Sequence, residues 1–501
     1  MTIPGEVVIL SADDDVAVAV RALAAGHPVA PGVITGAPIP AGHKVALRAV
    51  SAGSPVVKYG QVIGEALADI RPGDHVHVDN LGFGGGALRR AASAATPNPA
   101  RAGDAATFLG YRRADGRVGT RNWIGVVASV NCSTTVCRKI AEIATREILP
   151  RHPGIDGFVP IVHGQGCGST SSGDGPAILK RTLAGYLGHP NFGASLLIGL
   201  GCEVNQIALY AAAGRAAPIT SFNIQDAGGS RAAVERALEQ LEALAAEASQ
   251  ARREPCPTSD LVVGLQCGGS DGFSGITANP ALGAAMDRLI AAGGTAYLSE
   301  TPEIWGAEHL LTARATPEVA AKLQARLDWW RSYVAATGAS LDNNPSPGNK
   351  RGGLTTILEK SLGAVAKGGR SRLVDVVEYA ARSETRGLVF MDTPGYDPVS
   401  ATGQVAGGAN LVVFTTGRGS CFGCRPAPSL KVSSNSDLAR RMAEDIDVDA
   451  GTILTGSASV EEVGEAIWRR ILATASGEPT RSEAFGYGDD EFVPWHVGAV
   501  L

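Results

Sequence analysis

The sequence predicts an α/β protein in which a small N-terminal β-rich domain precedes two parallel-sheet α/β domains. Short apolar runs separated by glycine, proline and turn residues fill residues 1–82, and strands alternate with helices from residue 108 onward. A polar break near residue 255 divides this second part. A length of 501 residues is ample for several domains. We therefore place the domains at 1–82, 108–255 and 256–501, with a linker over 83–107.

In the N-terminal domain, the runs EVVIL, HKVALRAV, PVVKYGQVIG and DHVHVDN are typical of β-strands. The stretch SADDDVAVAVRALAAG predicts a helix, because Ser11 can cap its first turn and the aspartates there suit the helix dipole. His75 and His77 are two residues apart, so on a strand they share one face. There they either bind a common ligand or are merely exposed.

The two α/β domains follow from the alternation of elements. WIGVVASV, FVPIV, SLLIGL and PITSFNI predict the strands of the first, with helices over STTVCRKIAEIATREIL and GGSRAAVERALEQLEALAAEASQ. LVVGL, TAYLSE, RGLVFM and ANLVVFTTG predict strands of the second, with a helix over VAAKLQARLDWWRSYVAA. Such alternation is typical of parallel sheets, whose carboxyl edges collect the ligand-binding loops.

Composition and charge exclude several classes of protein. The chain is 45% hydrophobic and 19% charged, with a net charge of −5 and no basic run, so we expect no nucleic-acid partner. No apolar stretch approaches the roughly 18–20 residues of a membrane span, and MTIPGEVVIL lacks the features of a secretory signal. The eight scattered cysteines do not resemble a disulfide framework. We expect a cytoplasmic protein with reduced thiols and no membrane partner, and we leave a homo-oligomer open.

Four cysteines come directly after predicted strands and before predicted helices: Cys132, Cys167, Cys202 and Cys267. A helix N-terminus favours the reactive thiolate form, and adjacent glycines let backbone and ligand approach closely. The alternative is that each cysteine is a small buried hydrophobic residue. Their spacing fits no compact zinc motif, so a shared metal site would have to be assembled by the fold.

Other polar residues follow the strands as well. Asp271 lies in the glycine turn of LQCGGSDGFSG, and an arginine among glycines and threonines in FTTGRGS suits a carboxylate ligand. Lys350, in NPSPGNKRGG, offers a second anion contact or a proton carrier. The carboxylates at strand ends are otherwise explained as helix caps or solvated groups; they are Glu203, Glu300, Glu303, Asp392 and Asp397.

These stretches resemble the altronate/galactarate dehydratase family over nearly the whole chain. SADDDVAVAV, IPAGHKVAL and KYGQVIG resemble its small antifreeze-like SAF domain. GYRRADGRVGTRN, GLGCEVNQ, LQCGGSDGFSGITANP, NPSPGNKRGGLTTILEKSLGAVAKGG and FTTGRGS resemble its core signatures. MDTPGYDPVS, and FGC ahead of RPAPSLK, are most similar to the altronate branch. Cys421 stands where that branch suggests a residue without a thiol, so the Cys421–Cys424 pair is interpreted as structural.

The resemblance implies an iron-dependent hydro-lyase that removes water across C2 and C3 of a sugar acid, an altronate-like aldonate, to give a 2-keto-3-deoxy acid. The C2 proton lies beside a carboxylate, so the developing enediolate needs preorganised positive charge or a metal ion. Our metal-ligand candidates are Cys167, Cys202 and Cys267, with Cys132 close by. They would hold either a ferrous ion or an iron–sulfur cluster.

The remaining candidates divide by role. His43 and His163 are candidates for the base and the acid, in either order, and Lys350 is a further proton carrier. The substrate-binding candidates are Lys44, Asp271, Thr415, Thr416 and Arg418. Three alternatives stay open: a related lyase acting on galactarate or expelling sulfite from a sulfonated hydroxy acid, a thiol–disulfide enzyme centred on Cys421 and Cys424, and a non-catalytic sugar-acid-binding protein.

Overall fold

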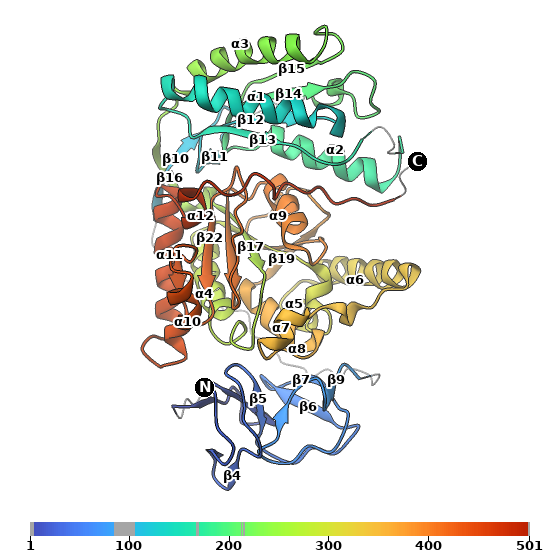
Figure 1. The fold of residues 1–501 in the computed structure, drawn as a ribbon, viewed down its shortest axis with the longest axis vertical. Coiled ribbons are helices and arrows are strands. Elements are labelled where there is room, and N and C mark those ends of the chain that lie inside the picture. The colour runs from blue at the N-terminus through green and yellow to red at the C-terminus, as the bar shows by residue number, and fades with distance from the viewer. Residues whose placement is uncertain (1–4, 85–105, 167–169, 212, 214–215, 499–501) are drawn as a thin grey trace.

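A computed structural model describes residues 5–84, 106–166, 170–211, 213 and 216–498. Three units lie along the long axis of the molecule (Figure 1). The N-terminal domain is at one end, the C-terminal domain is in the middle, and the second domain of the sequence is at the other end. The architecture confirms the predicted α/β class, with an antiparallel β domain followed by two parallel sheets. No helix in the described ranges combines the length and apolar character needed to cross a membrane.

The N-terminal domain consists of short antiparallel strands. One sheet has the order β1 (Val7–Val8), β2 (Val16–Ala19), β5 (Lys44–Ala46) and β8 (His75–Val76). A second contains β6 (Pro55–Lys58), β7 (Gln61–Ala66) and β9 (Leu81–Gly82), and β3 (Pro28–Ala30) pairs with β4 (Val33–Ile34). Most of the predicted linker, residues 85–105, lies outside the described residues.

The helix predicted over SADDDVAVAVRALAAG is wrong, because this segment forms a turn followed by strand β2. The Asp14 carboxylate does not face a helix N-terminus. It accepts hydrogen bonds from the backbone N–H groups of Leu10, Ser11 and Gly60, which closes a turn. Valines at 16, 18 and 20 alternate with a period of two, and this strand signal outweighs the apparent cap.

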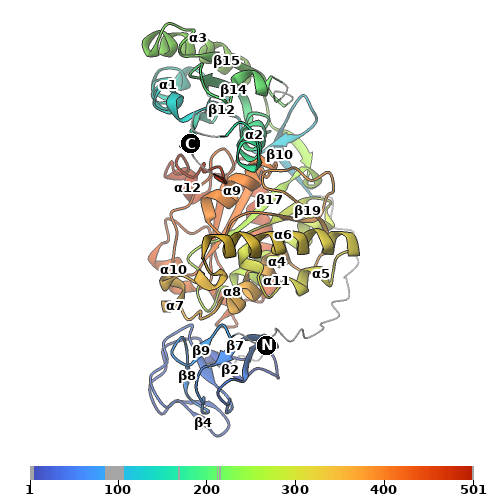
Figure 2. The ribbon, with the colours of Figure 1, turned by 90° about the vertical axis from the view of Figure 1, so that its right-hand side faces the viewer.

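The second domain is a parallel sheet with the order β13 (Gly157–Ile161), β12 (Trp123–Ala128), β14 (Phe192–Gly199) and β15 (Ile219–Asn223). Helices α1 (Thr134–Glu147), α2 (Asp174–Leu187) and α3 (Ser230–Ala248) accompany it (Figure 2). A small sheet of β10 (Thr107–Arg112), β11 (Val118–Gly119) and β16 (Glu254–Pro257) joins the start of this domain to its end.

The C-terminal domain contains a 7-stranded parallel sheet. Its order is β19 (Leu373–Val377), β20 (Leu388–Met391), β18 (Thr295–Leu298), β17 (Val262–Cys267), β21 (Leu411–Thr416), β22 (Ser429–Ser433) and β23 (Val448–Asp449). The larger helices are α4 (Ala278–Ala291), α6 (Pro317–Thr337), α8 (Ile357–Val365), α9 (Asp397–Ala406) and α11 (Val460–Ala475). Shorter ones are α5 (His309–Thr312), α7 (Pro347–Arg351), α10 (Ser436–Arg441) and α12 (Arg481–Ala484).

A buried ion-pair network joins the N-terminal domain to the C-terminal domain. The Glu359 carboxylate on α8 accepts hydrogen bonds from Lys44 Nζ and Lys58 Nζ, both at 2.9 Å, and all three side chains are 0% exposed. Lys44 Nζ also donates to the Gly353 carbonyl at 2.7 Å. Because unpaired charges are very costly inside a protein, this network fixes how the two domains dock.

Glycines allow the two backbones to meet at the same junction. The Gly272 N–H donates to the Gly352 carbonyl at 2.8 Å. A Cβ atom on Gly272 would lie 2.0 Å from the Gly42 carbonyl oxygen, and one on Gly353, where φ is +102°, would lie 2.1 Å from it. Side chains at these two positions would push the domains apart, which explains two of the glycines in the sequences around Asp271 and Lys350.

Candidate active site

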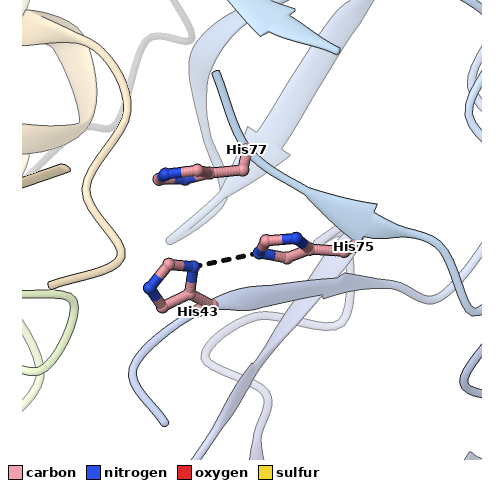
Figure 3. Close-up of side chains that lie close together, drawn as sticks. All are labelled: His43, His75 and His77. Atoms are coloured by element: carbon pink, nitrogen blue, oxygen red, sulfur yellow. Dashed lines mark hydrogen bonds between the residues drawn. The ribbon is translucent and has the colours of Figure 1, made fainter. Parts of the chain in front are cut away.

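Three histidines of the N-terminal domain come together at the face that meets the C-terminal domain (Figure 3). His43 Nδ1 lies 2.9 Å from His75 Nε2, and one ring nitrogen from each of His43, His75 and His77 lies within 4.8 Å of the others. The ring centroids are 4.8–5.4 Å apart. We call these three residues the histidine site.

The local strand geometry explains why these rings converge. In the antiparallel pair of β5 and β8, Lys44 lies opposite Val76. His43, one residue before Lys44, therefore lies opposite His77, one residue after Val76. Side chains alternate along each strand, which places His75 and His77 on one face, as their spacing predicted. Asn80 braces the turn after β8, accepting from the His77 N–H and donating to the His75 carbonyl, both at 2.9 Å.

The three imidazoles of the histidine site are close enough together to hold a metal ion. Burial lowers the pKa of all three imidazoles, that of His77 to about 4, so at neutral pH they are uncharged and each ring has one nitrogen without a proton. His77 Nδ1 is buried and has no hydrogen-bond partner among the described residues. Neutral imidazole nitrogen is a common ligand of iron and zinc. An orphaned ring nitrogen beside two others therefore fits a transition-metal ion.

A polar cavity of about 320 Å³ lies between the N-terminal and C-terminal domains. Ala41 contributes to its wall, and Arg351 connects it to the histidine site, because His43 Nε2 lies 3.2 Å from the Arg351 carbonyl. Arg351, Arg418 and Arg441 line the cavity, and within the described residues none of them has an ion-pair partner. Unpaired guanidinium groups are suited to bind a carboxylate.

Asp271 lines the same cavity but is already committed to the protein. Its carboxylate accepts hydrogen bonds from Ser274 Oγ and Ser434 Oγ at 2.9 and 2.8 Å, and from Asn435 Nδ2 at 3.0 Å. Burial raises the pKa of this carboxyl group, although these donors oppose the rise. Asp271 therefore shapes the cavity wall by holding the loop after β22 in place.

The other residues predicted to bind substrate are engaged elsewhere. Lys44 is used in the buried network with Glu359. Thr415 Oγ1 donates to Asn279 Oδ1 at 2.6 Å, and Thr416 Oγ1 accepts from the Gly419 N–H at 3.0 Å. Both threonines are buried and hold the end of β21, which carries Arg418 to the cavity.

The sequence did not lead us to predict a role for Lys58 and Glu359, two members of the buried ion-pair network that joins the domains. A signal was present, since ILEKSLGAV contains adjacent charges in an otherwise apolar run, and every residue of α8 is buried. A charge in a fully buried helix must be paired, which marks Glu359 as part of an interdomain contact.

His163 follows β13 in the second domain, and this domain lies at the other end of the molecule from the N-terminal domain (Figure 1). Its Nδ1 accepts from the Gln165 N–H at 3.2 Å, and its Nε2 lies 3.1 Å from the Ala128 carbonyl. His189 repeats this arrangement with the Asn191 N–H and the Ala409 carbonyl. Both rings are therefore held in the neutral form, and the structure does not bring His163 to the histidine site.

Because His163 and His189 are held in the neutral form, we expect the free energy of unfolding to decrease as the pH falls. Burial lowers the pKa of His163 to about 4 and that of His189 to about 3, so the unfolded chain binds protons first as the pH falls below 6.5. For each histidine, the fall in the free energy of unfolding should approach about 1.4 kcal/mol per pH unit once the pH is well below 6.5. Denaturant titrations between pH 7 and about pH 5 measure this slope. His189→Gln should flatten this slope, and a slope equal to that of wild type would refute the assignment.

The cysteines predicted as metal ligands are divided between two sheets. Cys132 and Cys202 are exposed in the second domain, after β12 and β14, whereas Cys267 ends β17 in the C-terminal domain. Cys167 lies outside the described residues. Of the local pair, Cys421 is exposed and Cys424 is buried, and both are free thiols.

Cys267 belongs to a buried cluster of opposite charges. Lys367 Nζ lies 3.0 Å from both Cys267 Sγ and Glu300 Oε2, and Lys360 Nζ lies 2.7 Å from Glu303 Oε1. The cluster brings a thiol and two carboxylates close enough to hold a metal ion. Lys367 and Lys360, however, already contact the thiol and the two carboxylates, so a divalent cation would have to displace both buried ammonium groups. We therefore leave Cys267 out of the metal site that we propose.

Comparison with known proteins covers all three units. The altronate/galactarate dehydratase SAF domain matches residues 5–83. The second domain of D-galactarate dehydratase/altronate hydrolase matches residues 110–249, and the C-terminal domain of D-galactarate/altronate dehydratase matches residues 258–500.

Individual relatives agree with these family matches. The chain is 39% identical over 461 residues to galactarate dehydratase (L-threo-forming) of Escherichia coli (strain K12), covering 89% of this chain and 88% of that protein. It is 38% identical over 476 residues to altronate dehydratase of the same organism, covering 94% and 95%. It is 34% identical over 387 residues to the (2R)-sulfolactate sulfo-lyase subunit beta of Chromohalobacter salexigens, covering 76% and 95%. With its SAF domain, second domain and C-terminal domain all matched, the chain belongs to the altronate/galactarate dehydratase family and is a hydro-lyase acting on sugar acids.

Proposed function

We propose that this protein removes water across C2 and C3 of an altronate-like aldonate, giving a 2-keto-3-deoxy acid, with iron bound at the histidine site. The observation that carries this proposal is the junction of three neutral imidazoles with a cavity lined by unpaired arginines. Substrate anion and metal ion would then meet at the boundary between the two domains.

His43, His75 and His77 would hold the iron. When bound, the ion would act as a Lewis acid that stabilises negative charge developing beside the substrate carboxylate. The protein supplies the remaining conditions. The buried Lys44–Glu359–Lys58 network fixes the histidines against the C-terminal domain, and Arg351 and Arg418 attract the carboxylate.

A screen of hexonates and hexarates for 2-keto acid formation, with anaerobically purified protein and ferrous iron, tests the proposal. We expect turnover of an aldonate, with deuterium from D₂O entering at C3 of the product. Turnover of a hexarate alone would reassign the substrate to the galactarate type. Release of sulfite from a sulfolactate, or binding without any turnover, would refute the dehydration of an aldonate.

Arg418 should contribute mainly to substrate binding. Its guanidinium lines the cavity at the end of β21 and is exposed. Hydrogen bonds to charged groups contribute about 1.5–3 kcal/mol, so Arg418→Gln should raise KM about 10–100-fold. Steady-state kinetics with the substrate found in the screen measure this change. Arg386→Gln is the control, because Arg386 pairs with Asp260 and does not line the cavity; an unchanged KM in Arg418→Gln would remove Arg418 from the site.

Lys350 is our proposed carrier of the C2 proton. It lies on α7 directly before Arg351 and is half-buried, and within the described residues its ammonium group has no ion-pair partner. General base catalysis contributes about 10²–10⁴-fold, so Lys350→Gln should reduce kcat by that factor while KM and metal binding stay close to wild type. Exchange of the C2 proton with solvent deuterium, followed by NMR, isolates this step. Wild-type exchange rates in the variant would assign the proton transfer to another residue.

A further inference from the structure

A backbone carbonyl of the C-terminal domain contacts the histidine site and orients one of its rings. His43 Nε2 lies 3.2 Å from the Arg351 carbonyl oxygen, and His43 Nδ1 lies 2.9 Å from His75 Nε2 (Figure 3). A carbonyl oxygen can only accept, so the hydrogen bond to Arg351 requires that the single proton of neutral His43 is on Nε2. His43 Nδ1, which faces the other imidazoles, is therefore the nitrogen with a lone pair for a metal ion.

The position of α7 decides whether this hydrogen bond forms. Arg351 is the last residue of α7, so its carbonyl reaches His43 only while the helix is held at the boundary between the two domains. Metal-binding histidines usually donate their second ring N–H to a carbonyl or carboxylate group, which fixes the tautomer and the orientation of the ring. The Arg351 carbonyl has this relation to His43.

Asn349 ties α7 to the body of the C-terminal domain. It is 4% exposed, and its Nδ2 donates to the carbonyl of Ser270, in the loop after β17, at 2.8 Å. Its Oδ1 accepts from the N–H and the hydroxyl group of Ser346, both at 3.0 Å. Because Ser346 caps the N-terminus of α7, the Asn349 side chain both closes this short helix and attaches it to the neighbouring loop.

A second asparagine anchors the chain just before α7. Asn344 Nδ2 donates to Glu303 Oε1 at 2.6 Å, and Asn344 Oδ1 accepts from Lys360 Nζ at 2.8 Å. Glu303 and Lys360 are both buried and lie 2.7 Å from each other. The segment that carries the Arg351 carbonyl is therefore attached at two points by buried polar contacts, which makes its position well defined.

We infer that Asn349 is a positioning residue of the histidine site. It holds the Arg351 carbonyl against His43 and so fixes the tautomer in which His43 binds a metal ion. Asn349 is not among the residues that line the cavity, so it acts through Arg351 and His43 and not on the substrate. The inference rests on the metal site of the proposed function, but the tautomer of His43 in the metal-free chain tests it separately.

Cobalt binding to the full chain measures the effect on the metal site. Loss of a group that orients a metal ligand typically costs about 10–100-fold in metal affinity, so Asn349→Ala should weaken nitrogen-ligated Co²⁺ binding by that factor. Asn343→Ala, which replaces an exposed asparagine of the same segment, should bind cobalt as tightly as wild type. Equal affinity in Asn349→Ala and wild type would overturn the inference.

The tautomer of His43 is read in the metal-free chain by ¹⁵N NMR with labelled histidine. The chain has nine histidines, and the signals lost in His43→Asn identify those of His43. We expect the proton on Nε2 in wild type and a mixture of both tautomers in Asn349→Ala. A proton on Nδ1 in wild type, or the same His43 signals in both proteins, would contradict the inference. If the His43 signals change as expected but wild type binds no cobalt through nitrogen, the positioning by Asn349 is supported and the proposed metal site is refuted.

Discussion

Glu359→Gln is expected to lower the free energy of unfolding by about 3–5 kcal/mol and to loosen the N-terminal domain from the rest of the chain. The substitution keeps the shape of the side chain but leaves Lys44 and Lys58 buried without a counter-charge. The two lysines already hold the pKa of Glu359 far below its usual range, so this carboxylate is ionised throughout the working pH range of the protein. Denaturant unfolding of wild type and variant measures the loss.

The matched control is Glu142→Gln, which removes the exposed pair with Lys139 on α1. Because both partners are more than half exposed, this change should cost less than about 1 kcal/mol. Similar stability losses in both variants would mean that the buried network does not hold the domains together. Since the histidine site lies on this docked domain and the arginines of the cavity on the C-terminal domain, Glu359→Gln should also lose dehydratase activity.

His75→Asn is expected to weaken metal binding at the histidine site by at least about 100-fold. The change removes one of three imidazoles whose nitrogens lie within 4.8 Å of one another, while leaving the strand pairing of β8 intact. Cobalt is a suitable probe, because nitrogen-ligated and thiolate-ligated Co²⁺ absorb in different regions. We expect the nitrogen-ligated bands to disappear and any thiolate-to-cobalt band to remain.

His27→Asn provides the control for this experiment. His27 lies in the same N-terminal domain, where it pairs with Glu6 and does not belong to the histidine site. Its replacement should leave the nitrogen-ligated cobalt bands unchanged. Full nitrogen-type binding in His75→Asn would show that the three imidazoles do not form the metal site.

The sequence could predict what short-range patterns determine. Apolar runs that alternate with amphipathic segments identified both parallel sheets, and the period of two placed His75 and His77 on one face. The same kind of pattern was overlooked at Val16 and Val18, because the serine and aspartates before them imitate a helix cap. Serine and aspartate are favoured both in turns and at helix N-caps, so these residues alone do not distinguish a strand from a helix after them. The pairing of β2 with β1 and β5 decides in favour of the strand.

Contacts between distant segments were beyond the reach of the sequence. His43 joins His75 and His77 only because β5 pairs with β8, and the arginine cavity exists only because the N-terminal domain docks onto the C-terminal domain. Cys267 follows its strand just as Cys132 and Cys202 do, yet it ends in a different sheet, beside Lys367. Position after a strand predicts which edge a residue occupies, but not which sheet or which neighbours it meets.

The most direct test of the account is product formation by the anaerobic full chain in D₂O, followed by NMR while ferrous iron is titrated. Wild type should convert the aldonate to a 2-keto-3-deoxy acid labelled at C3, with a saturable dependence on iron, and His75→Asn should form no product at the same iron concentrations. Product formed by the chelator-treated wild type, or by His75→Asn with an unchanged iron dependence, would contradict the claim that the histidine site at the domain junction supports dehydration.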